Sequence, residues 1–304
     1  MIKQMIFHAL RFCGASFAWL QLRQRGRVTI LCFHDPSPED FRRHVRRLKK
    51  WYRIIALDTY LAARQAGDMS TLPHPALVLT IDDGHRGNAE LQAVLAQEGV
   101  PVTIFLSTAG TDTDKPFWWT LPQSKAEVER LKRLPNHERL AELQRIPAPG
   151  GATRQALTRD EIRALASYAD FQSHTVSHPI LPQCDAEEAR AEIFESKAEI
   201  ERRYGWKVTT FAYPNGDYSQ RDIELVREAG YFCAVTVDEG LNDGQTDLFR
   251  LKRILVDDDA GVSELLVKAS GLMPAMKNAI KKWRGRPTDQ FHAAPNRTSH
   301  FPAQ

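Results

Sequence analysis

The chain has 304 residues and a net charge of +3, and 42% of its residues are hydrophobic. This length is enough to bury a full core, and this composition excludes a disordered or collagen-like chain. No apolar run reaches the roughly 18 to 20 residues of a membrane-spanning helix. The small positive charge gives no argument for a nucleic acid partner.

Residues 1–27 form the first distinct segment. They contain five basic residues, and no acidic residue precedes Asp35. Their apolar residues lie near helical spacing, which predicts a basic amphipathic helix. Such a helix binds an anionic membrane surface peripherally or packs on the domain, and we leave both open. A secretory signal is less favoured, because the apolar stretch 12–22 runs into arginines without a cleavage site.

The four cysteines are scattered and form no CxxC pair: Cys13, Cys32, Cys184 and Cys233. This spacing argues against a disulfide framework and against a cysteine zinc cluster. Reduced thiols favour the cytoplasm, and membrane binding through residues 1–27 would place the protein on the inner face of the membrane.

Residues 28–270 alternate short β-branched runs with segments of helical period, which predicts a parallel sheet with crossover helices. Eight strand candidates favour a distorted (β/α) barrel of seven or eight mostly parallel strands, with an open doubly wound sheet as the alternative. Residues 109–157 form an insertion with charged helical turns. Residues 271–304 are predicted to be a basic, disordered tail. The strand candidates are Val28–Phe33, Arg53–Leu57, Ala76–Ile81, Val102–Leu106, Asp170–Ser173, Val208–Tyr213, Phe232–Thr236 and Leu251–Val256.

The residues suited to catalysis follow four of these strands directly: His34, Asp82 with Asp83, His174 with His178, and the turn after Ala212. In a parallel barrel all strands open on one face, so the topology would bring these residues together. One aspartate and two histidines make a three-ligand set with open positions, as in a catalytic metal site. The alternatives to a metal site are purely structural: an Asp-Asp-Gly turn that caps the next helix, and histidines that pack in the core. A non-haem iron oxygenase uses the same ligand types, but its usual all-β fold does not fit.

Three motifs resemble those of the polysaccharide deacetylases, the NodB homology domain. Thr80–Gly84 (TIDDG) resembles TFDDG, Ser173–Pro179 (SHTVSHP) resembles SHTxxHP, and Phe211–Gly216 (FAYPNG) resembles the proline-containing third motif. The resemblance covers roughly residues 28–257. It implies a distorted barrel and metal-dependent removal of acetyl groups from N-acetylated sugars.

The resemblance also implies residue roles. Asp82 would be the general base, Asp83, His174 and His178 would hold one divalent ion, and the Asn215 N–H, in the motif with Tyr213, would stabilise the oxyanion. The default ion is zinc, although nickel, cobalt or iron would fit the same ligands.

This sequence departs from the family pattern at two places. Ala212 replaces the motif arginine that orients the base, and Arg253 is our candidate for supplying that charge from another strand. No late histidine is suited to be the catalytic acid, but Leu31–Asp35 looks like a circularly permuted branch with an N-terminal histidine. We therefore assign the acid role to His34.

Trp118 and Trp119 in the insertion would either stack on a sugar ring or anchor the insertion to the barrel. The leading function is glycan deacetylation. A catalytically weak or inactive deacetylase-like protein that binds glycan is the main alternative, and a membrane-surface scaffold is a third. The sequence leaves open whether the substrate is a polymer, a lipid-linked glycan or a small acetamide.

Overall fold

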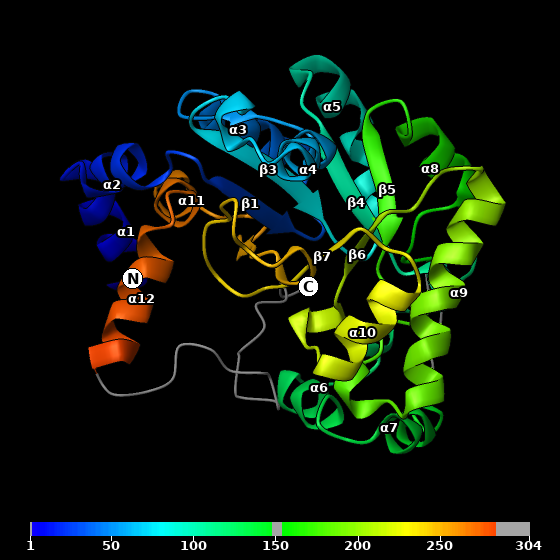
Figure 1. Ribbon diagram of the computed structural model, residues 1–304. Coiled ribbons are helices and arrows are strands. Elements are labelled where there is room, and N and C mark those ends of the chain that lie inside the picture. Colours follow the sequence, from blue (N-terminus) through cyan, green and yellow to red (C-terminus); the bar gives the residue numbers. More distant parts are fainter. Residues whose placement is uncertain (1, 148–153, 284–304) are drawn as a thin grey trace.

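The computed structural model describes residues 2–147 and 154–283. Its described strands form one parallel sheet in the order β7-β6-β5-β4-β3-β1-β8, with β2 paired to β3 on the side (Figure 1). The sheet curls on itself, because Leu251 just before β8 bridges Val235 of β7 in parallel, while β8 pairs with β1. The bounds are β1 (Val28–Phe33), β2 (Arg53–Ile54), β3 (Ala76–Ile81), β4 (Val102–Leu106), β5 (Ala169–Ser173), β6 (Thr210–Ala212), β7 (Cys233–Val235) and β8 (Ile254–Leu255).

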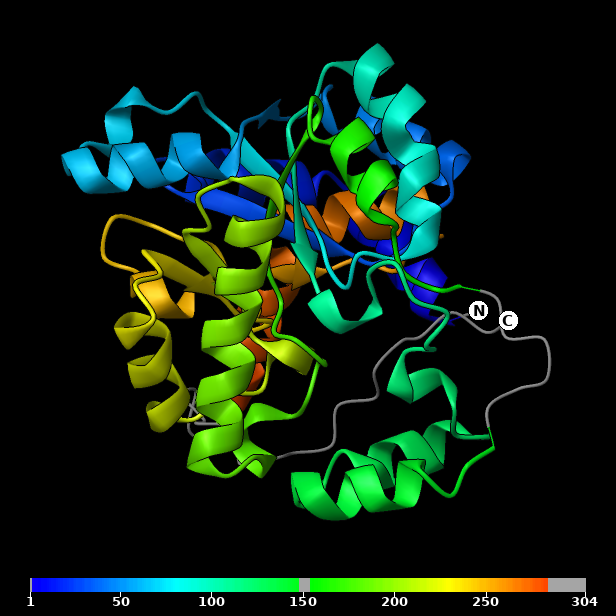
Figure 2. The ribbon, with the colours of Figure 1, turned by 90° about the vertical axis from the view of Figure 1, so that its right-hand side faces the viewer.

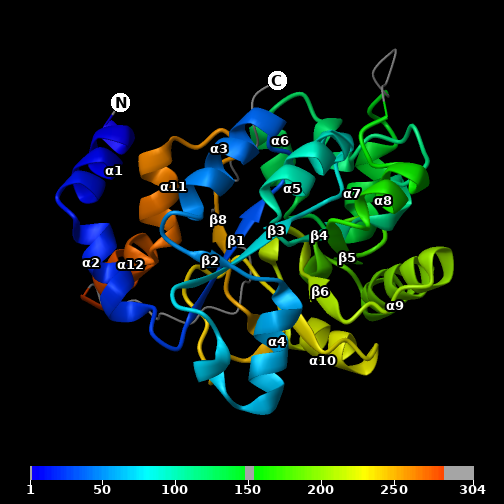
Figure 3. The same ribbon diagram turned by 90° about the horizontal axis from the view of Figure 1, so that it is seen from above.

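Helices surround this sheet (Figure 3). Three of them begin at capping boxes, in which Thr158, Asp185 and Ser219 accept from the helix backbone. The barrel helices are α3 (Pro38–Leu48), α4 (Leu57–Ala66), α5 (Gln92–Glu98), α8 (Arg159–Leu165), α9 (Ala186–Tyr204), α10 (Gln220–Glu228) and α11 (Val262–Ala269). The insertion contributes α6 (Lys125–Leu131) and α7 (Asn136–Leu143), which lie below the barrel in Figure 2.

Alternation along the strands divides the core in two. Leu31 and Phe33 of β1, like Leu79 and Ile81 of β3, pack outward against the helices. The even-numbered residues of these two strands, such as Ile30 of β1, point into the barrel. Because successive side chains face opposite sides of a strand, the next inward positions along the chain are residue 32 of β1 and residue 34 just after the strand.

The predicted α/β barrel fold is confirmed, and each of the eight strand candidates overlaps an observed strand. The candidate Arg53–Leu57 was too long: pairing ends at Ile54, and Leu57 begins α4, a helix that we did not predict. A 3-10 helix, Arg86–Leu91, directly precedes α5.

The first two and the last of the described helices lie together on one side of the barrel. The predicted N-terminal helix is two helices, α1 (Ile2–Phe12) and α2 (Ala15–Arg23), broken at Gly14, whose φ is 76°. The prediction of a disordered tail was wrong for its first part, because α12 (Leu272–Trp283) is a helix that contacts α2 and α11. Residues 284–304 lie outside the described residues. Within the described part of the chain, no helix is long and apolar enough to cross a bilayer.

Candidate active site

Asp82 and Arg253 form a buried ion pair inside the barrel. Arg253 Nη1 donates to Asp82 Oδ1 at 2.6 Å and Nη2 donates to Oδ2 at 2.7 Å. The same guanidinium donates to the Thr236 carbonyl through Nε and to Thr80 Oγ1. The guanidinium absent from position 212 is therefore present from the strand segment before β8, where it orients the Asp82 carboxylate through two bonds.

Asp83, His174 and His178 converge on one point. His174 Nε2 lies 3.5 Å and His178 Nε2 lies 3.4 Å from Asp83 Oδ1, which is buried and has no hydrogen-bond partner in the described structure. For tetrahedral zinc with ligands at ~2.1 Å, neighbouring ligand atoms lie ~3.4 Å apart. An unpartnered buried carboxylate oxygen is costly unless a cation neutralises it. These three residues therefore fit a divalent ion.

Hydrogen bonds and burial prepare the three groups as ligands. His174 Nδ1 bonds to the Ala212 carbonyl at 2.8 Å, which leaves Nε2 facing Asp83. Burial lowers the pKa of His178 to about 3, so its ring is neutral and carries a free lone pair. Burial raises the pKa of Asp83. His178 and the hydrogen bond from His85 outweigh burial and hold the pKa of this carboxyl group well below its usual range.

The loops that carry these groups adopt an unusual backbone conformation. Asp83, Thr175, His178 and Asn215 have φ values of 74°, 68°, 54° and 57°. Left-handed backbone is uncommon for residues other than glycine and persists only where surrounding contacts hold it. It redirects the chain at the strand ends, so that Asp83 and His178 face the same point.

Three supporting residues were not identified from the sequence. His85 Nε2 lies 3.1 Å from Asp83 Oδ2, the carboxylate oxygen that faces away from His174 and His178. Glu192 of α9 accepts from the backbone N–H groups of Val176 and Ser177. Asp258 accepts from the backbone of His34 at 3.0 Å. The sequence offered one signal, since His85 directly follows the Asp-Asp-Gly motif.

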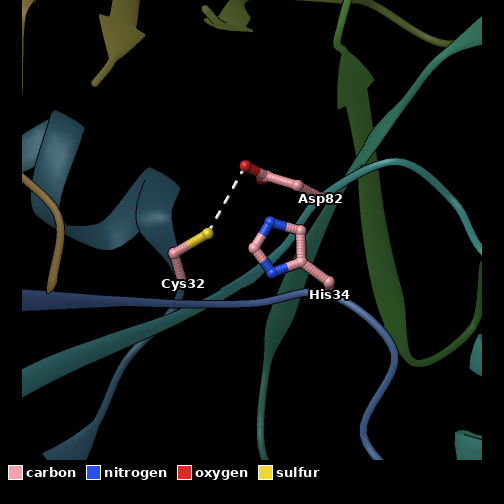
Figure 4. Close-up of side chains that lie close together, drawn as sticks. All are labelled: Cys32, His34 and Asp82. Carbon is pink, nitrogen blue, oxygen red and sulfur yellow. Dashed lines mark hydrogen bonds between the residues drawn. The ribbon is translucent and has the colours of Figure 1, made fainter. Parts of the chain in front are cut away.

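His34 lies beside Asp82 at the end of β1, and Cys32 lies two residues earlier on the same inward face (Figure 4). Ligand atoms of these three residues lie within 4.8 Å of one another. Burial raises the pKa of Cys32 well above its usual value, so the thiol stays protonated and donates to Asp82 Oδ2 at 3.4 Å. Because Arg253 already neutralises Asp82, we do not assign a second cation to this group.

The third motif is only partly at the site. β6 ends at Ala212, whose carbonyl accepts from His174. Asn215 lies in the following turn with its side chain bonded to Asp217. The Tyr213 side chain points outward into the helix-side core, and its hydroxyl donates to the Phe249 carbonyl at 3.2 Å. The backbone N–H of Tyr213 donates a hydrogen bond to the Val235 carbonyl.

Trp118 and Trp119 are 9% and 7% exposed and pack in the apolar cluster of the insertion. Trp118 Nε1 donates to the His178 carbonyl at 2.8 Å. The Trp119 ring lies 4.4 Å from the His178 ring, centre to centre. The structure thus favours anchoring over exposed sugar stacking, and the insertion supports the His178 loop.

The fold and the site together define an α/β-barrel protein with a carboxylate–imidazole site at the carboxyl ends of its strands. A family profile described as "Polysaccharide deacetylase" matches residues 70–234, more than half of the chain. The chain therefore belongs to the polysaccharide deacetylase family. The matched range contains Asp82, Asp83, His174 and His178, whereas His34 and Arg253 lie outside it.

Solved structures share the fold at low sequence identity. The Streptococcus pyogenes deacetylase PplD, in complex with acetate, is 19% identical, with a TM-score of 0.59 over 80% of this chain and 98% of that one. IcaB from Ammonifex degensii is 17% identical, with a TM-score of 0.59 over 81% and 98% of the two chains. At these identities the likeness shows the fold alone. A search of curated proteins found no match.

Proposed function

We propose that this protein is a metal-dependent N-deacetylase that removes acetyl groups from N-acetylated sugars of a glycan or glycan precursor. The observation that carries the proposal is the unpartnered Asp83 Oδ1, which faces Nε2 of His174 and His178 at 3.4 to 3.5 Å. These three residues would hold the ion, with zinc as the default and nickel, cobalt or iron as alternatives. The ion would polarise the acetamide carbonyl and lower the pKa of the attacking water.

Asp82 is the proposed general base. Burial raises its pKa, but Arg253 and His174 more than offset burial and hold the pKa at about 2, so the carboxylate is ionised at neutral pH. It can therefore accept a proton from the water that adds to the carbonyl carbon. Arg253 keeps the carboxylate in one orientation, which supports this role for Asp82.

His34 is the proposed acid. When the bond between the carbonyl carbon and the sugar nitrogen breaks, the nitrogen needs a proton, and His34 would donate it so that the products are acetate and a free amine. Its place beside Asp82 at the adjacent strand end supports this role. The Asn215 N–H is our candidate donor to the developing oxyanion.

The alternative of an inactive glycan-binding protein rested on the missing motif arginine and on the displaced acid. The Arg253–Asp82 pair and the position of His34 weaken both objections.

Acetate release tests the proposal. The panel contains N-acetylglucosamine oligomers, a lipid-linked glycan and a small acetamide, each measured with and without chelator. We expect release from at least one glycan, loss with chelator, and recovery on adding zinc. Asp82→Asn should abolish release while the ion stays bound. Release that is insensitive to chelator, or an Asp82→Asn variant of near-normal activity, contradicts the mechanism.

A further inference from the structure

Exposed hydrophobic side chains concentrate on the first two and the last of the described helices. Within the described residues, seven of the nine large exposed hydrophobic residues belong to α1, α2 and α12. These helices are neighbours, since α2 contacts both α1 and α12 (Figures 1 and 3). We define them as the terminal patch: Met5, Ile6, Phe12, Phe17, Leu22, Met276 and Ile280.

Helix α1 packs on the protein through Phe7, which is 4% exposed, and polar side chains on either side of Phe7 bond to the neighbouring helix. Gln4 Nε2 donates to Glu264 at 3.2 Å, His8 Nδ1 bonds to Ser263 at 3.0 Å, and Arg11 donates to the same hydroxyl. Both partners belong to α11, against which α1 packs. Phe7 and these contacts therefore determine which face of α1 lies against the protein.

The opposite face of α1 is apolar and faces outward. Met5, Ile6, Ala9 and Phe12 follow helical spacing, and Met5 and Phe12 are 66% and 74% exposed. On the next helix, Leu22 is 76% exposed. Exposed apolar surface that follows one helix face marks an interaction site, because single scattered residues would not share a stripe.

The segment that carries α1 and α2 has charge of one sign. The segment before Asp35 carries Lys3, Arg11, Arg23, Arg25 and Arg27 and no acidic residue. Arg23 and Arg25 are exposed beside Leu22. An apolar helix face flanked by basic residues matches an anionic lipid surface, into which the apolar side chains insert while the basic groups meet the headgroups.

We propose that the terminal patch docks this protein on anionic membranes as a peripheral protein. This inference depends on the surface of α1, α2 and α12 and not on the deacetylase chemistry, so it stands or falls separately from the proposed function.

Vesicle co-sedimentation of the full chain tests the proposal, with phosphatidylcholine vesicles that do or do not contain phosphatidylglycerol. We expect binding to the anionic vesicles only, weakened by salt. Phe12→Ser together with Leu22→Ser should reduce affinity at least about tenfold, because insertion of each side chain contributes substantially. Arg25→Glu should also weaken binding. Leu140→Ser, at an exposed leucine of α7 that is 42% accessible, is the matched control and should bind like the unmodified chain.

A second readout uses Cys13, which is exposed at the end of α1, while Cys32, Cys184 and Cys233 are buried. A polarity-sensitive fluorophore on Cys13 should shift to the blue with anionic vesicles. Equal binding to both vesicle types, no binding, or unchanged binding by the Phe12→Ser and Leu22→Ser variant overturns the proposal. So does light scattering that shows a dimer which the same variant converts to a monomer, since a second copy would then cover the patch.

Discussion

Replacing Arg253 by methionine leaves Asp82 as a buried carboxylate without its counter-ion. Arg253 is fully buried and makes two bonds to Asp82. The pair holds the pKa of Asp82 at about 2 against an ordinary 3.8, and that shift corresponds to ~2.5 kcal/mol. Burial would push the pKa of the unpaired carboxylate above its ordinary value, so we expect a loss of about 3–5 kcal/mol in unfolding free energy at neutral pH.

The loss should depend on pH in a defined direction. The folded-state pKa of Asp82 is depressed, so the pair stabilises the protein above the unfolded-state pKa, near 3.8. That stabilisation disappears as the pH falls toward about 2. The difference in unfolding free energy between the unmodified chain and Arg253→Met should therefore shrink between pH 5 and pH 3.

Denaturant unfolding of metal-free protein provides the measurement. Adding Asp82→Asn to Arg253→Met should recover much of the loss, because the uncompensated charge is gone. Arg46→Met is the control: Arg46 pairs with Glu98 at 2.6 Å but is 63% exposed, and its loss should cost less than ~1 kcal/mol. Purely additive losses in the double variant would refute the reasoning.

Three further predictions concern the residues around this pair. His34→Asn should lower kcat for acetate release by about 10²- to 10⁴-fold with little change in KM. A rise in KM with unchanged kcat would instead assign His34 to substrate binding. His85→Ala should weaken zinc affinity by about 10- to 100-fold in competition with a chromophoric chelator, because His85 orients Asp83; unchanged affinity would show that this bond does not support the ligand. Trp119→Leu should change KM for glycan less than about twofold because the ring is buried, whereas a large rise in KM would restore the sugar-stacking interpretation.

The strands and the site residues at their ends were predictable from local sequence. β-branched runs mark β1 and β3, and period-two alternation then determines that Cys32, His34 and Asp82 share the inward face. Arg253 was a candidate only because Ala212 stands where the family motif carries an arginine, so that the charge would come from another strand. The geometry of the Arg253–Asp82 pair needed the fold, since 171 residues separate the partners.

Other features depend on tertiary contacts that no local pattern records. Glu192 supports the His178 loop from the surrounding helix α9, and an acidic residue on a helix has no special signal. The burial of Trp118 could not be predicted from the sequence either, because sugar-binding surfaces and the cores of insertions both contain aromatic residues. Helix α12 was missed because basic, polar composition suggested disorder, while contacts with α2 and α11 order it.

The central claim is that Asp83, His174 and His178 hold one catalytic divalent ion. Metal analysis of the purified full chain, together with equilibrium dialysis against zinc, tests it most directly. We predict one tightly bound ion per chain, lost in Asp83→Ala and in His174→Ala and retained in His137→Ala, a change at an exposed histidine of α7. No bound ion, or an ion that survives both Asp83→Ala and His174→Ala, would contradict the account.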